Sequence, residues 1–496
     1  MKYLKILLFA LFFLYVSPLF AQKQSIEFTE SNFAKKKKSL QVALRNLKIA
    51  QGILEIDQDY ASALKYYLRA NKFNPKNAQL NYIIGKCYLY QKNPDLKSAI
   101  KHLEEASSFT ACDPEIVYLL ACTYQRASEW QKAINEFKRY IKMVEDQNEK
   151  VAKAQKRLQE CESGKTLSQN PRHITIEHLG KQFNTRFDEM GPVISADEKM
   201  MLFTAKRNTT TGYEMSEDGL FYEDIYVAHK NKGGNWTKFT KLQGVNSNGS
   251  DAIVSITSNG KRIILYKGVQ NGDLYAGTIE KDKVYDIKPL PNVFNTPFRE
   301  TSATMNSENN LIFFTSNRPG GKGGLDIWFS RKNENNTWEE AQNMGELINT
   351  PYDEEGVCLS ADGKTLYFSS KGHNSIGGYD IFKTVFREGT WSKPENIGIP
   401  LNTPNDEVFV SLSQDGKRLY FSSFRSDSYG ASDIYIATLL GEPKEPELTP
   451  IAALNTQQAV EVGLYTPSST IERILLTDDY TVVKGKVLDP DTGKPL

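Results

Sequence analysis

The sequence of 496 residues contains little cysteine and little histidine, with five residues of each. The cysteine number is odd and no Cys-x-x-Cys pair occurs, so we expect neither a disulfide framework nor a zinc site. Cys87 and Cys122 fall at small apolar positions of a helical pattern and are predicted to lie in a core. The histidines lack the spacing of metal ligands, so we expect them to be exposed or in turns and predict no metal and no cofactor. They are His102, His173, His178, His229 and His373.

A surplus of charge is also missing, because 61 Lys and Arg residues stand against 60 Asp and Glu residues. The formal net charge of +1 gives no electrostatic footprint for nucleic acid, whose binding requires many phosphates to be neutralised. One basic block, Lys35 to Lys38, is predicted to be the solvated start of a helix. We therefore expect no nucleic acid among the partners.

Apolar runs are short, and the first of them has the form of a secretory signal. Lys2 and Lys5 precede the apolar run 6–16, which is too short to cross a bilayer that requires about 20 residues. A small residue, Ala21, then offers a cleavage site. Residues 1–21 are therefore predicted to be a signal peptide, the alternative being a retained membrane anchor. No later segment is long enough to span a membrane, so we expect no transmembrane segment after cleavage.

Residues 39–162 have helical periodicity and repeat internally. The step Gly85-x-x-Tyr88 recurs as Ala121-x-x-Tyr124, and we expect the small residues to let paired helices approach closely. The pattern resembles tetratricopeptide repeats, helix–turn–helix units of about 34 residues that stack because one hairpin alone cannot bury its apolar stripe. We expect an α-solenoid with a concave groove, made of hairpins at roughly 44–77, 78–113 and 114–146 and a polar capping helix at 148–162.

A linker is predicted at 163–173, and a second kind of repeat follows over 174–440. Each unit has a turn such as Ser360-Ala-Asp-Gly-Lys364, whose Asp-Gly supplies the positive φ angles of a tight hairpin. An aromatic strand such as Leu366–Ser370 comes next, and then a strand that begins with Asp-Ile-Tyr or a variant of it. The unit ends with a short outer strand and an Asn-Thr or Asn-Ser loop such as Asn402-Thr403.

Five such units, each with about four short strands, predict a five-bladed β-propeller. The segment His173–Gly180 matches an outer strand but precedes the first full unit, and the fifth unit lacks such a strand. We therefore expect this first strand to complete the last blade, which closes the ring and leaves no open edge. A sixth blade is the alternative if residues 449–480 add strands. The motifs of the units resemble the WD40-like PD40 repeat family, which implies the same fold.

No residue is predicted to be catalytic, to bind a cofactor or to bind a metal. An aspartate opens the third strand of each unit, and because it recurs we expect it to bond the neighbouring Gly-rich turn rather than act in catalysis or bind calcium. Ser-x-Asp-Gly turns also occur in sialidases, but the paired carboxylates of a glycosidase cannot be singled out. Gly430-Ala-Ser432 lacks the final glycine of a hydrolase nucleophile motif. The aspartates are Asp224, Asp273, Asp326, Asp380 and Asp433.

The end of the chain predicts a Pro/Glu-rich linker at 441–480 and the first strand of another domain at 481–496. The last segment resembles the start of a carboxypeptidase-regulatory-like β-sandwich. Because so short a segment cannot bury a core, we expect the chain to be an incomplete copy of something longer.

The order of signal peptide, helical repeats, PD40 propeller and regulatory-like domain resembles OmpA-family envelope proteins, in particular the PorE-like group of the type IX secretion system. That family usually carries a C-terminal OmpA-like domain that grips peptidoglycan. This sequence lacks that domain, so a peptidoglycan partner is implied only if such a domain follows.

Together these features predict a multidomain protein, α then β. The resemblance implies a non-catalytic scaffold in the periplasm, associated with the outer membrane. Envelope proteins are the expected partners, bound through the helical groove and the propeller face. One alternative is a binding module for a glycan or small ligand at the concave mouth of the propeller. Another is a propeller hydrolase.

Overall fold

The computed structural model describes residues 23–144, 148–213, 215, 219–257, 259–268, 272–441, 474–476 and 480–482. The chain separates into two compact units, Met1–Gly441 and Glu442–Leu496. In the second unit the described residues form one antiparallel pair, β22 (Ile474–Leu476) with β23 (Tyr480–Val482). The predicted signal peptide lies outside the described residues, as does most of the predicted regulatory-like segment. The domain boundaries drawn from the sequence stay predictions.

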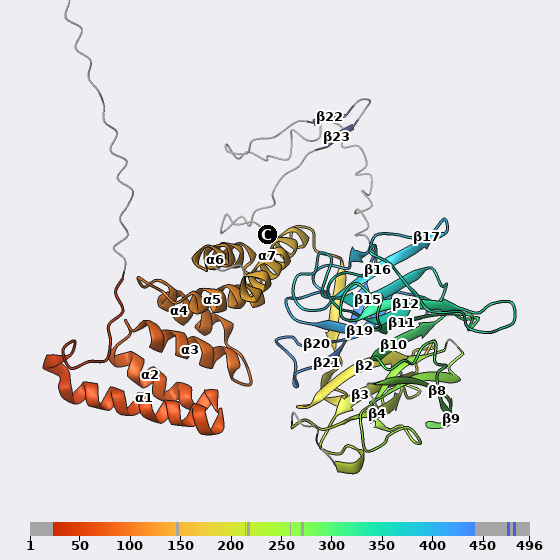
Figure 1. Ribbon diagram of the computed structural model, residues 1–496, viewed down its shortest axis with the longest axis horizontal. Coiled ribbons are helices and arrows are strands. Elements are labelled where there is room, and N and C mark those ends of the chain that lie inside the picture. The colour runs from red at the N-terminus through yellow and green to blue at the C-terminus, as the bar shows by residue number, and fades with distance from the viewer. Residues whose placement is uncertain are drawn as a thin grey trace, which may run out of the picture. The chain divides into compact units, whose positions relative to one another are not determined.

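Among the described residues, seven α-helices form the N-terminal part of the first unit (Figure 1). They are α1 (Lys37–Asp57), α2 (Tyr60–Phe73), α3 (Ala78–Tyr90), α4 (Leu96–Ser107), α5 (Pro114–Arg126), α6 (Trp130–Met143) and α7 (Glu149–Leu167). Helices α1 to α6 pack as three consecutive pairs, as the repeat pattern predicts. Each of the helices α2 to α5 is preceded by a residue whose side-chain oxygen accepts a backbone N–H of the first turn. These residues are Asp59, Asn77, Asp95 and Asp113. Within the part of the chain that the structure describes, no helix has the length and apolar character needed to cross a membrane.

The predicted close approach of paired helices is confirmed at Gly85 in α3. A Cβ atom at this position would lie 2.6 Å from Leu103 Cγ of α4, so only glycine fits without displacing that side chain. Cys87 is fully buried in the core of the first two hairpins, as expected, and Cys122 packs half-buried against the core of the last one. All five cysteines are free thiols.

Five antiparallel sheets follow the helices and form blades 1 to 5 of a propeller, which confirms the predicted fold (Figure 1). Each blade begins with an innermost strand and ends with an outer one. The strands of blades 1 and 2 are β2 (Asp188–Ile194), β3 (Met200–Lys206), β4 (Glu223–His229), β5 (Thr240–Lys241), β6 (Asp251–Ile256), β7 (Arg262–Lys267), β8 (Asp273–Glu280) and β9 (Lys283–Pro289). Those of blades 3 and 4 are β10 (Glu300–Met305), β11 (Leu311–Ser316), β12 (Asp326–Arg331), β13 (Gln342–Asn343), β14 (Glu354–Leu359), β15 (Thr365–Ser370), β16 (Asp380–Arg387), β17 (Thr390–Trp391) and β18 (Glu395–Asn396). Blade 5 consists of β19 (Glu407–Leu412), β20 (Arg418–Ser423), β21 (Asp433–Leu439) and β1 (Ile174–His178).

The ring closes as predicted, because the first strand of the propeller completes its last blade. Strand β1 runs antiparallel to β21, with Ile174 opposite Leu439 and His178 opposite Tyr435. The outer edge of blade 5 is therefore formed by a strand that is distant in sequence from the rest of the blade. This pairing leaves β21 with a hydrogen-bonded neighbour on both sides.

The Ser-x-Asp-Gly turns owe their shape to local hydrogen bonds. In blade 4, Ser360 Oγ donates to Asp362 Oδ1 at 2.5 Å and accepts the Thr365 N–H at 2.9 Å. Gly363 has a φ angle of 71°, the left-handed conformation that Asp-Gly predicts. Blade 1 has Glu198 at this place with a φ of 54°, so the turn there forms without glycine.

Helix α7 differs from the polar capping helix that the sequence predicts, because one side of it contacts the propeller. Lys156 Nζ donates to Ser375 Oγ of blade 4 at 3.0 Å. Gln125 Nε2 of α5 donates to the Ile376 carbonyl oxygen at 3.3 Å. The Ile376 side chain is fully buried within the hydrophobic cluster of the last helices. A loop of blade 4 therefore completes the helical core.

Candidate functional site

The aspartates that open the third strands lie beside Gly-rich turns, as predicted. In blade 3, Asp326 Oδ1 accepts the Gly323 N–H at 2.9 Å. Equivalent backbone N–H donors are bound by Asp224, Asp380 and Asp433. The loop before Asp273 falls partly outside the described residues. At the other four aspartates the structural role is confirmed.

The Gly-rich turns themselves are shaped by close packing onto the next blade. A Cβ atom at Gly323 would overlap the Tyr352 carbonyl oxygen, and one at Gly430 would overlap that of Phe187. Gly430 belongs to the string that resembles a hydrolase nucleophile motif. Ser432 in that string donates its backbone N–H to Asp188 Oδ1 at 3.2 Å, within a loop between blades. This string is thus part of the blade packing and not a strand-to-helix turn.

A second set of repeated carboxylates, which sequence reasoning missed, begins the innermost strands. In blade 3, Glu300 accepts bonds from the N–H and hydroxyl of Thr296 at 3.1 and 2.7 Å, and it pairs with Arg318 at 3.2 Å. Each of these carboxylates is at most 1% exposed. They are Glu189, Asp251, Glu300, Glu354 and Glu407. The sequence feature that could have revealed these carboxylates is their constant position after the Asn-Thr or Asn-Ser loop of each unit.

Blade 4 departs from this arrangement. Glu354 accepts bonds from Thr350 and Ser370 but has no cationic partner among the described residues. Two residues after Ser370, blade 4 has Gly372 at the position where blades 3 and 5 have an arginine. The next residue, His373, donates its Nε2 hydrogen to the Ile348 carbonyl oxygen at 2.9 Å. Burial raises the pKa of Glu354 to about 7. Blade 4 therefore holds a buried carboxyl that lacks the neutralising cation found in its neighbours.

The innermost strands line a narrow channel through the propeller. Val193, Val254, Val357 and Val410 line both of two cavities along it, of about 140 and 220 Å³. The larger of these also contains the polar residues Arg299, Glu355 and Tyr266. Burial raises the pKa of Glu355, a residue that is 8% exposed.

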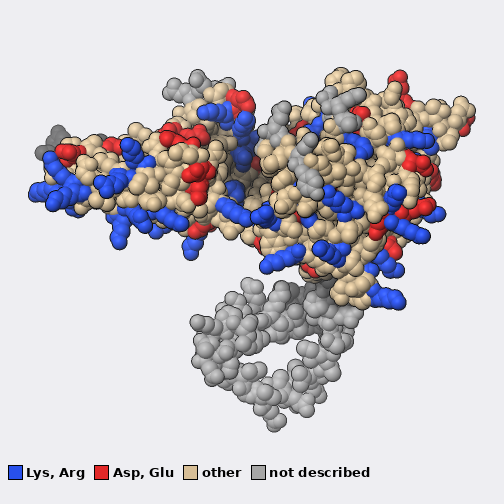
Figure 2. All heavy atoms as spheres, turned by 90° about the horizontal axis from the view of Figure 1, so that it is seen from below, with Lys and Arg blue, Asp and Glu red and all other residues tan. Residues whose placement is uncertain are grey.

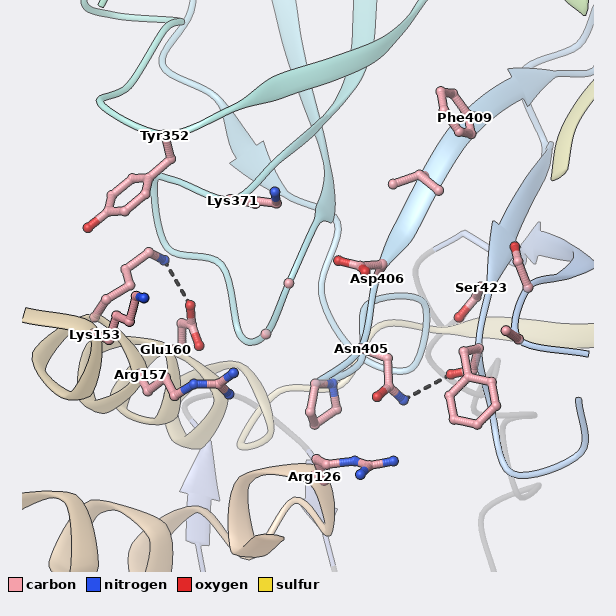
Figure 3. A pocket seen from close by; sticks show the side chains of 18 of the residues that line it. Arg126, Lys153, Arg157, Glu160, Tyr352, Lys371, Asn405, Asp406, Phe409 and Ser423 are labelled. Carbon is pink, nitrogen blue, oxygen red and sulfur yellow. Dashed lines mark hydrogen bonds and ion pairs between the residues drawn. The ribbon is translucent and has the colours of Figure 1, made fainter. Parts of the chain in front are cut away.

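A cavity of about 1140 Å³ lies between α5 and α7 on one side and loops of blades 4 and 5 on the other (Figure 3). Met190 and Phe409 line both this cavity and the channel, so the cavity opens onto the channel mouth. We call it the composite cavity because both repeat arrays form its walls. Its walls include Tyr118, Arg126, Lys153, Lys156, Arg157 and Glu160 from the helices, and Tyr352, Lys371, Asn405, Asp406, Phe409 and Phe424 from the propeller.

The composite cavity carries more basic than acidic side chains. Arg126, Lys153, Lys156, Arg157 and Lys371 line it, against Glu149, Glu160 and Asp406. Figure 2 shows Lys and Arg side chains gathered in the hollow between the helices and the propeller. Several cations are already paired: Lys156 lies 3.1 Å from Glu160 and 4.8 Å from the centre of the Tyr352 ring, and Lys371 lies 3.0 Å from Asp353. The remaining positive charge favours an anionic occupant.

Phe409 has an unusual backbone conformation where the cavity meets the channel. Its φ angle is 56°, in the left-handed region, whereas the corresponding bulges of blades 1 and 4 use Gly191 and Gly356. This conformation costs a bulky residue about 1–3 kcal/mol. The ring is half-buried and belongs to none of the hydrophobic clusters formed by the described residues. A strained aromatic residue that contributes little to the core marks the junction as a candidate contact surface.

The histidines show no metal-binding arrangement, but two of them correct the expectation that all are exposed or in turns. His178 lies at the end of β1 with its ring 11% exposed, and its Nε2 is 2.8 Å from Asp433 Oδ2. His102 is half-buried in α4, where its Nδ1 is 2.8 Å from Asn81 Oδ1. No cluster of three or more His, Cys, Asp or Glu side chains suited to a metal occurs in the described ranges.

Comparisons with known proteins do not place the chain in a family. No protein-family model and no curated protein matches the sequence. Similar solved structures include a gluconolactonase from Xanthomonas campestris, at 10% identity and a TM-score of 0.32, covering 53% of this chain and 91% of the other. An α-L-arabinofuranosidase from Lactobacillus brevis has 12% identity and a TM-score of 0.34, covering 53% and 92%. The MamA protein has 17% identity and a TM-score of 0.22, covering 28% and 71%. These similarities assign no activity to this chain.

Proposed function

We propose that this protein is a non-catalytic scaffold that holds other polypeptides in the composite cavity. The observation that carries the proposal is that two repeat arrays share the walls of one cavity of about 1140 Å³. Repeat arrays bind partners through extended concave surfaces rather than through one reactive constellation. The contacts of Gln125 and Lys156 with blade 4 hold the two walls together.

The size of the cavity supports a polypeptide occupant over a small molecule. Sites for small ligands enclose roughly 300–1,000 Å³ and bury most of the ligand. The composite cavity exceeds this range. An extended segment of a partner protein fits the larger space better.

We further propose that the scaffold works in the periplasm at the outer membrane, as a component of type IX secretion. This placement is supported by the form of residues 1–21 and by the order of repeats, which resembles PorE-like envelope proteins. Fractionation of cells that express the full chain tests it. A processed protein recovered with the outer membrane agrees with the proposal, and an unprocessed cytoplasmic protein contradicts it.

A photo-crosslinking experiment tests the scaffold role directly. A photoreactive amino acid replaces Tyr352 or Phe424 in the composite cavity, and, as a control, exposed Tyr285 in β9 of blade 2. We expect the cavity positions to yield defined crosslinked partners in envelope fractions and Tyr285 to yield none of them. Equal crosslinking at all three positions, or none at the cavity, would contradict the proposal.

A glycan or small-ligand site at the channel mouth is a second candidate function. It is favoured by the polar groups of Arg299, Glu355 and Tyr266, which line one cavity with an apolar floor of valines. Binding of the full chain to a glycan array, lost on Glu355→Gln, would support this function. Hydrolysis of glycosides or peptides by the purified chain would instead establish an enzyme.

A further inference from the structure

Two arginines of the composite cavity form no ion pair with any described carboxylate. Arg126 lies in the last turn of α5 and Arg157 in the middle of α7, and both side chains are half-buried. Arg157 Nη1 donates to Gln125 Oε1 at 3.0 Å. Arg126 makes no hydrogen bond or ion pair within the part of the chain that the structure describes. Figure 3 shows both side chains extending from the helical wall into the cavity.

For Arg126 this arrangement is unfavourable unless another group completes it. Burial also opposes the charge of Arg157, but its neighbours Cys122, Tyr118 and Glu160 together raise the pKa of Arg157. Burial lowers the pKa of Arg126, and the positive charge of Arg157 lowers it further. The dipole of α5 favours a cation in its last turn, but this effect cannot account for Arg157, which lies within a helix. The lysines of α7 that line the cavity do have partners, since Lys153 lies 2.7 Å from Glu149 and Lys156 lies 3.1 Å from Glu160.

The chemistry of the guanidinium group indicates what is missing. Its N–H donors lie in one plane and match the two oxygens of a carboxylate, and such charge-assisted bonds are about twice as strong as neutral ones. A partly desolvated cavity strengthens them further. An anion with planar, paired oxygens therefore satisfies Arg126 and Arg157 better than water does.

We propose that Arg126 and Arg157 bind a carboxylate from an acidic segment of a partner polypeptide. This inference rests on the proposed scaffold function and adds the chemistry by which the cavity selects its occupant. The adjoining walls contain Tyr118, Pro404 and Phe424, which suit the apolar side chains that flank acidic residues in a polypeptide. Positive charge beside apolar walls thus matches an acidic segment that also carries apolar residues.

Fluorescence anisotropy of the full chain with labelled hexaglutamate tests the proposal, with hexaglutamine as the neutral probe. We expect hexaglutamate to bind more tightly than hexaglutamine. Arg126→Gln and Arg157→Gln are each expected to weaken hexaglutamate binding about tenfold, the effect of losing one charge-assisted bond. The control is Arg69→Gln, which removes the same charge from an exposed site on α2 and is expected to leave binding unchanged.

Stability distinguishes a ligand site from a structural one. Because Arg126 has no internal partner, Arg126→Gln is expected to leave the melting temperature unchanged or to raise it. A large loss of stability would mean that the arginine serves the fold and would overturn the proposal. So would equal affinity for the two probes, or binding by the Arg126 and Arg157 variants that equals binding by the Arg69 control.

Three further outcomes identify which proposal fails. If an oligogalacturonate displaces hexaglutamate and binds more tightly, the anion site is a polysaccharide site and the polypeptide assignment is wrong. If the arginine variants lose no affinity while partners still crosslink to Tyr352 and Phe424, the scaffold function stands and the carboxylate site does not. If both crosslinking and hexaglutamate binding are absent, the scaffold function itself fails.

Discussion

At the scale of single residues, two glycines of the helical hairpins occupy opposite environments. A Cβ atom at Gly85 would lie 2.6 Å from Leu103 Cγ, whereas one at Gly52 of α1 would meet no atom within 4 Å. Glycine in an open helix position is destabilising because its unfolded chain is more flexible, while glycine at a crossing permits close packing. Identical residues in the same fold therefore contribute to stability with opposite signs.

The substitution Gly85→Ala is expected to lower the free energy of unfolding by about 1–3 kcal/mol, because Leu103 must move to admit the methyl group. The matched substitution Gly52→Ala is expected to raise it by about 0.5–1 kcal/mol. Urea titrations of the two variants and the native chain measure both changes. Equal effects at the two positions would show that α3 and α4 do not meet at Gly85.

At the scale of elements, the innermost strands begin with buried carboxylates that differ in their partners. Glu300 in β10 has Arg318 at 3.2 Å, and Glu189 in β2 has Arg207 at 2.8 Å. Glu354 in β14 has hydroxyl and N–H donors only. Burial makes Glu354 bind its proton more tightly than it does in the unfolded chain, which couples the stability of blade 4 to pH. Burial raises the pKa of Glu189 and Glu407 to about 7 as well, despite their arginine partners.

Stability is expected to fall as the pH rises through the window between the unfolded and folded pKa of Glu354, from 4.5 to about 7. In that window the folded protein keeps a proton that the unfolded chain has released. Glu354→Gln, which cannot lose a proton, should therefore gain stability relative to the native chain by up to about 3 kcal/mol between low and neutral pH. Denaturant titrations over this pH range measure the difference.

Glu300→Gln is the control for this experiment, because it leaves Arg318 buried without its carboxylate. We expect it to lower the free energy of unfolding by about 3 kcal/mol at neutral pH. If the two variants show the same pH dependence as each other, Glu354 does not titrate in this window.

At the scale of the whole molecule, closure of the ring depends on a few contacts between distant parts of the chain. In blade 4, Asn396 Nδ2 of the outer strand donates to Asp380 Oδ2 at 2.7 Å, and in blade 3 Asn343 binds Asp326 at 2.9 Å. His178 of β1 takes this place in blade 5, 2.8 Å from Asp433. Blade 5, which β1 completes, therefore has the same hydrogen bond between its third-strand aspartate and its outer strand as blades 3 and 4, with a histidine in place of the asparagine. We call the region where β1 completes blade 5 and blade 5 meets blade 1 the seam.

A second contact fastens the seam between blades 5 and 1. Glu198 of blade 1 accepts bonds from Arg418 Nε and the Tyr420 hydroxyl of blade 5, both at 2.7 Å. In the Ser-x-Asp-Gly turns of blades 4 and 5, glycine stands at the position that Glu198 has in the turn of blade 1. Of these three turns, only the one at the seam can therefore form this link to the neighbouring blade.

The seam predicts opposite outcomes for two substitutions of His178. His178→Asn supplies the residue that blades 3 and 4 use and is expected to change the free energy of unfolding by less than about 1 kcal/mol. His178→Ala removes a partner of buried Asp433 and is expected to cost about 1–3 kcal/mol and to expose residues 168–173 to proteases. Thermal unfolding and limited proteolysis measure the two effects. A stable alanine variant would show that β1 is held without this bond.

The sequence by itself determined the repeats, because each depends on contacts between residues that are close along the chain. The Asp-Gly of a turn such as Asp362-Gly363 and the place of Gly85 in its hairpin have local causes, and both predictions are confirmed. Closure by β1 could also be predicted, because a repeat unit was missing its outer strand at one end and a lone copy stood at the other. The pairing of Glu300 with Arg318 was missed, since nothing in the motif shows which side chains will be buried.

Only the tertiary structure decided where the candidate site lies. Arg126 and Arg157 fall in helical repeats, and Phe409 and Asp406 in a propeller unit hundreds of residues later, yet all of them line one cavity. No periodic signal connects these positions, because the cavity forms where two repeat arrays meet, and that contact occurs once. Its cause is the packing of Ile376 into the helical core, a contact between two surfaces that each repeat pattern predicts to be separate.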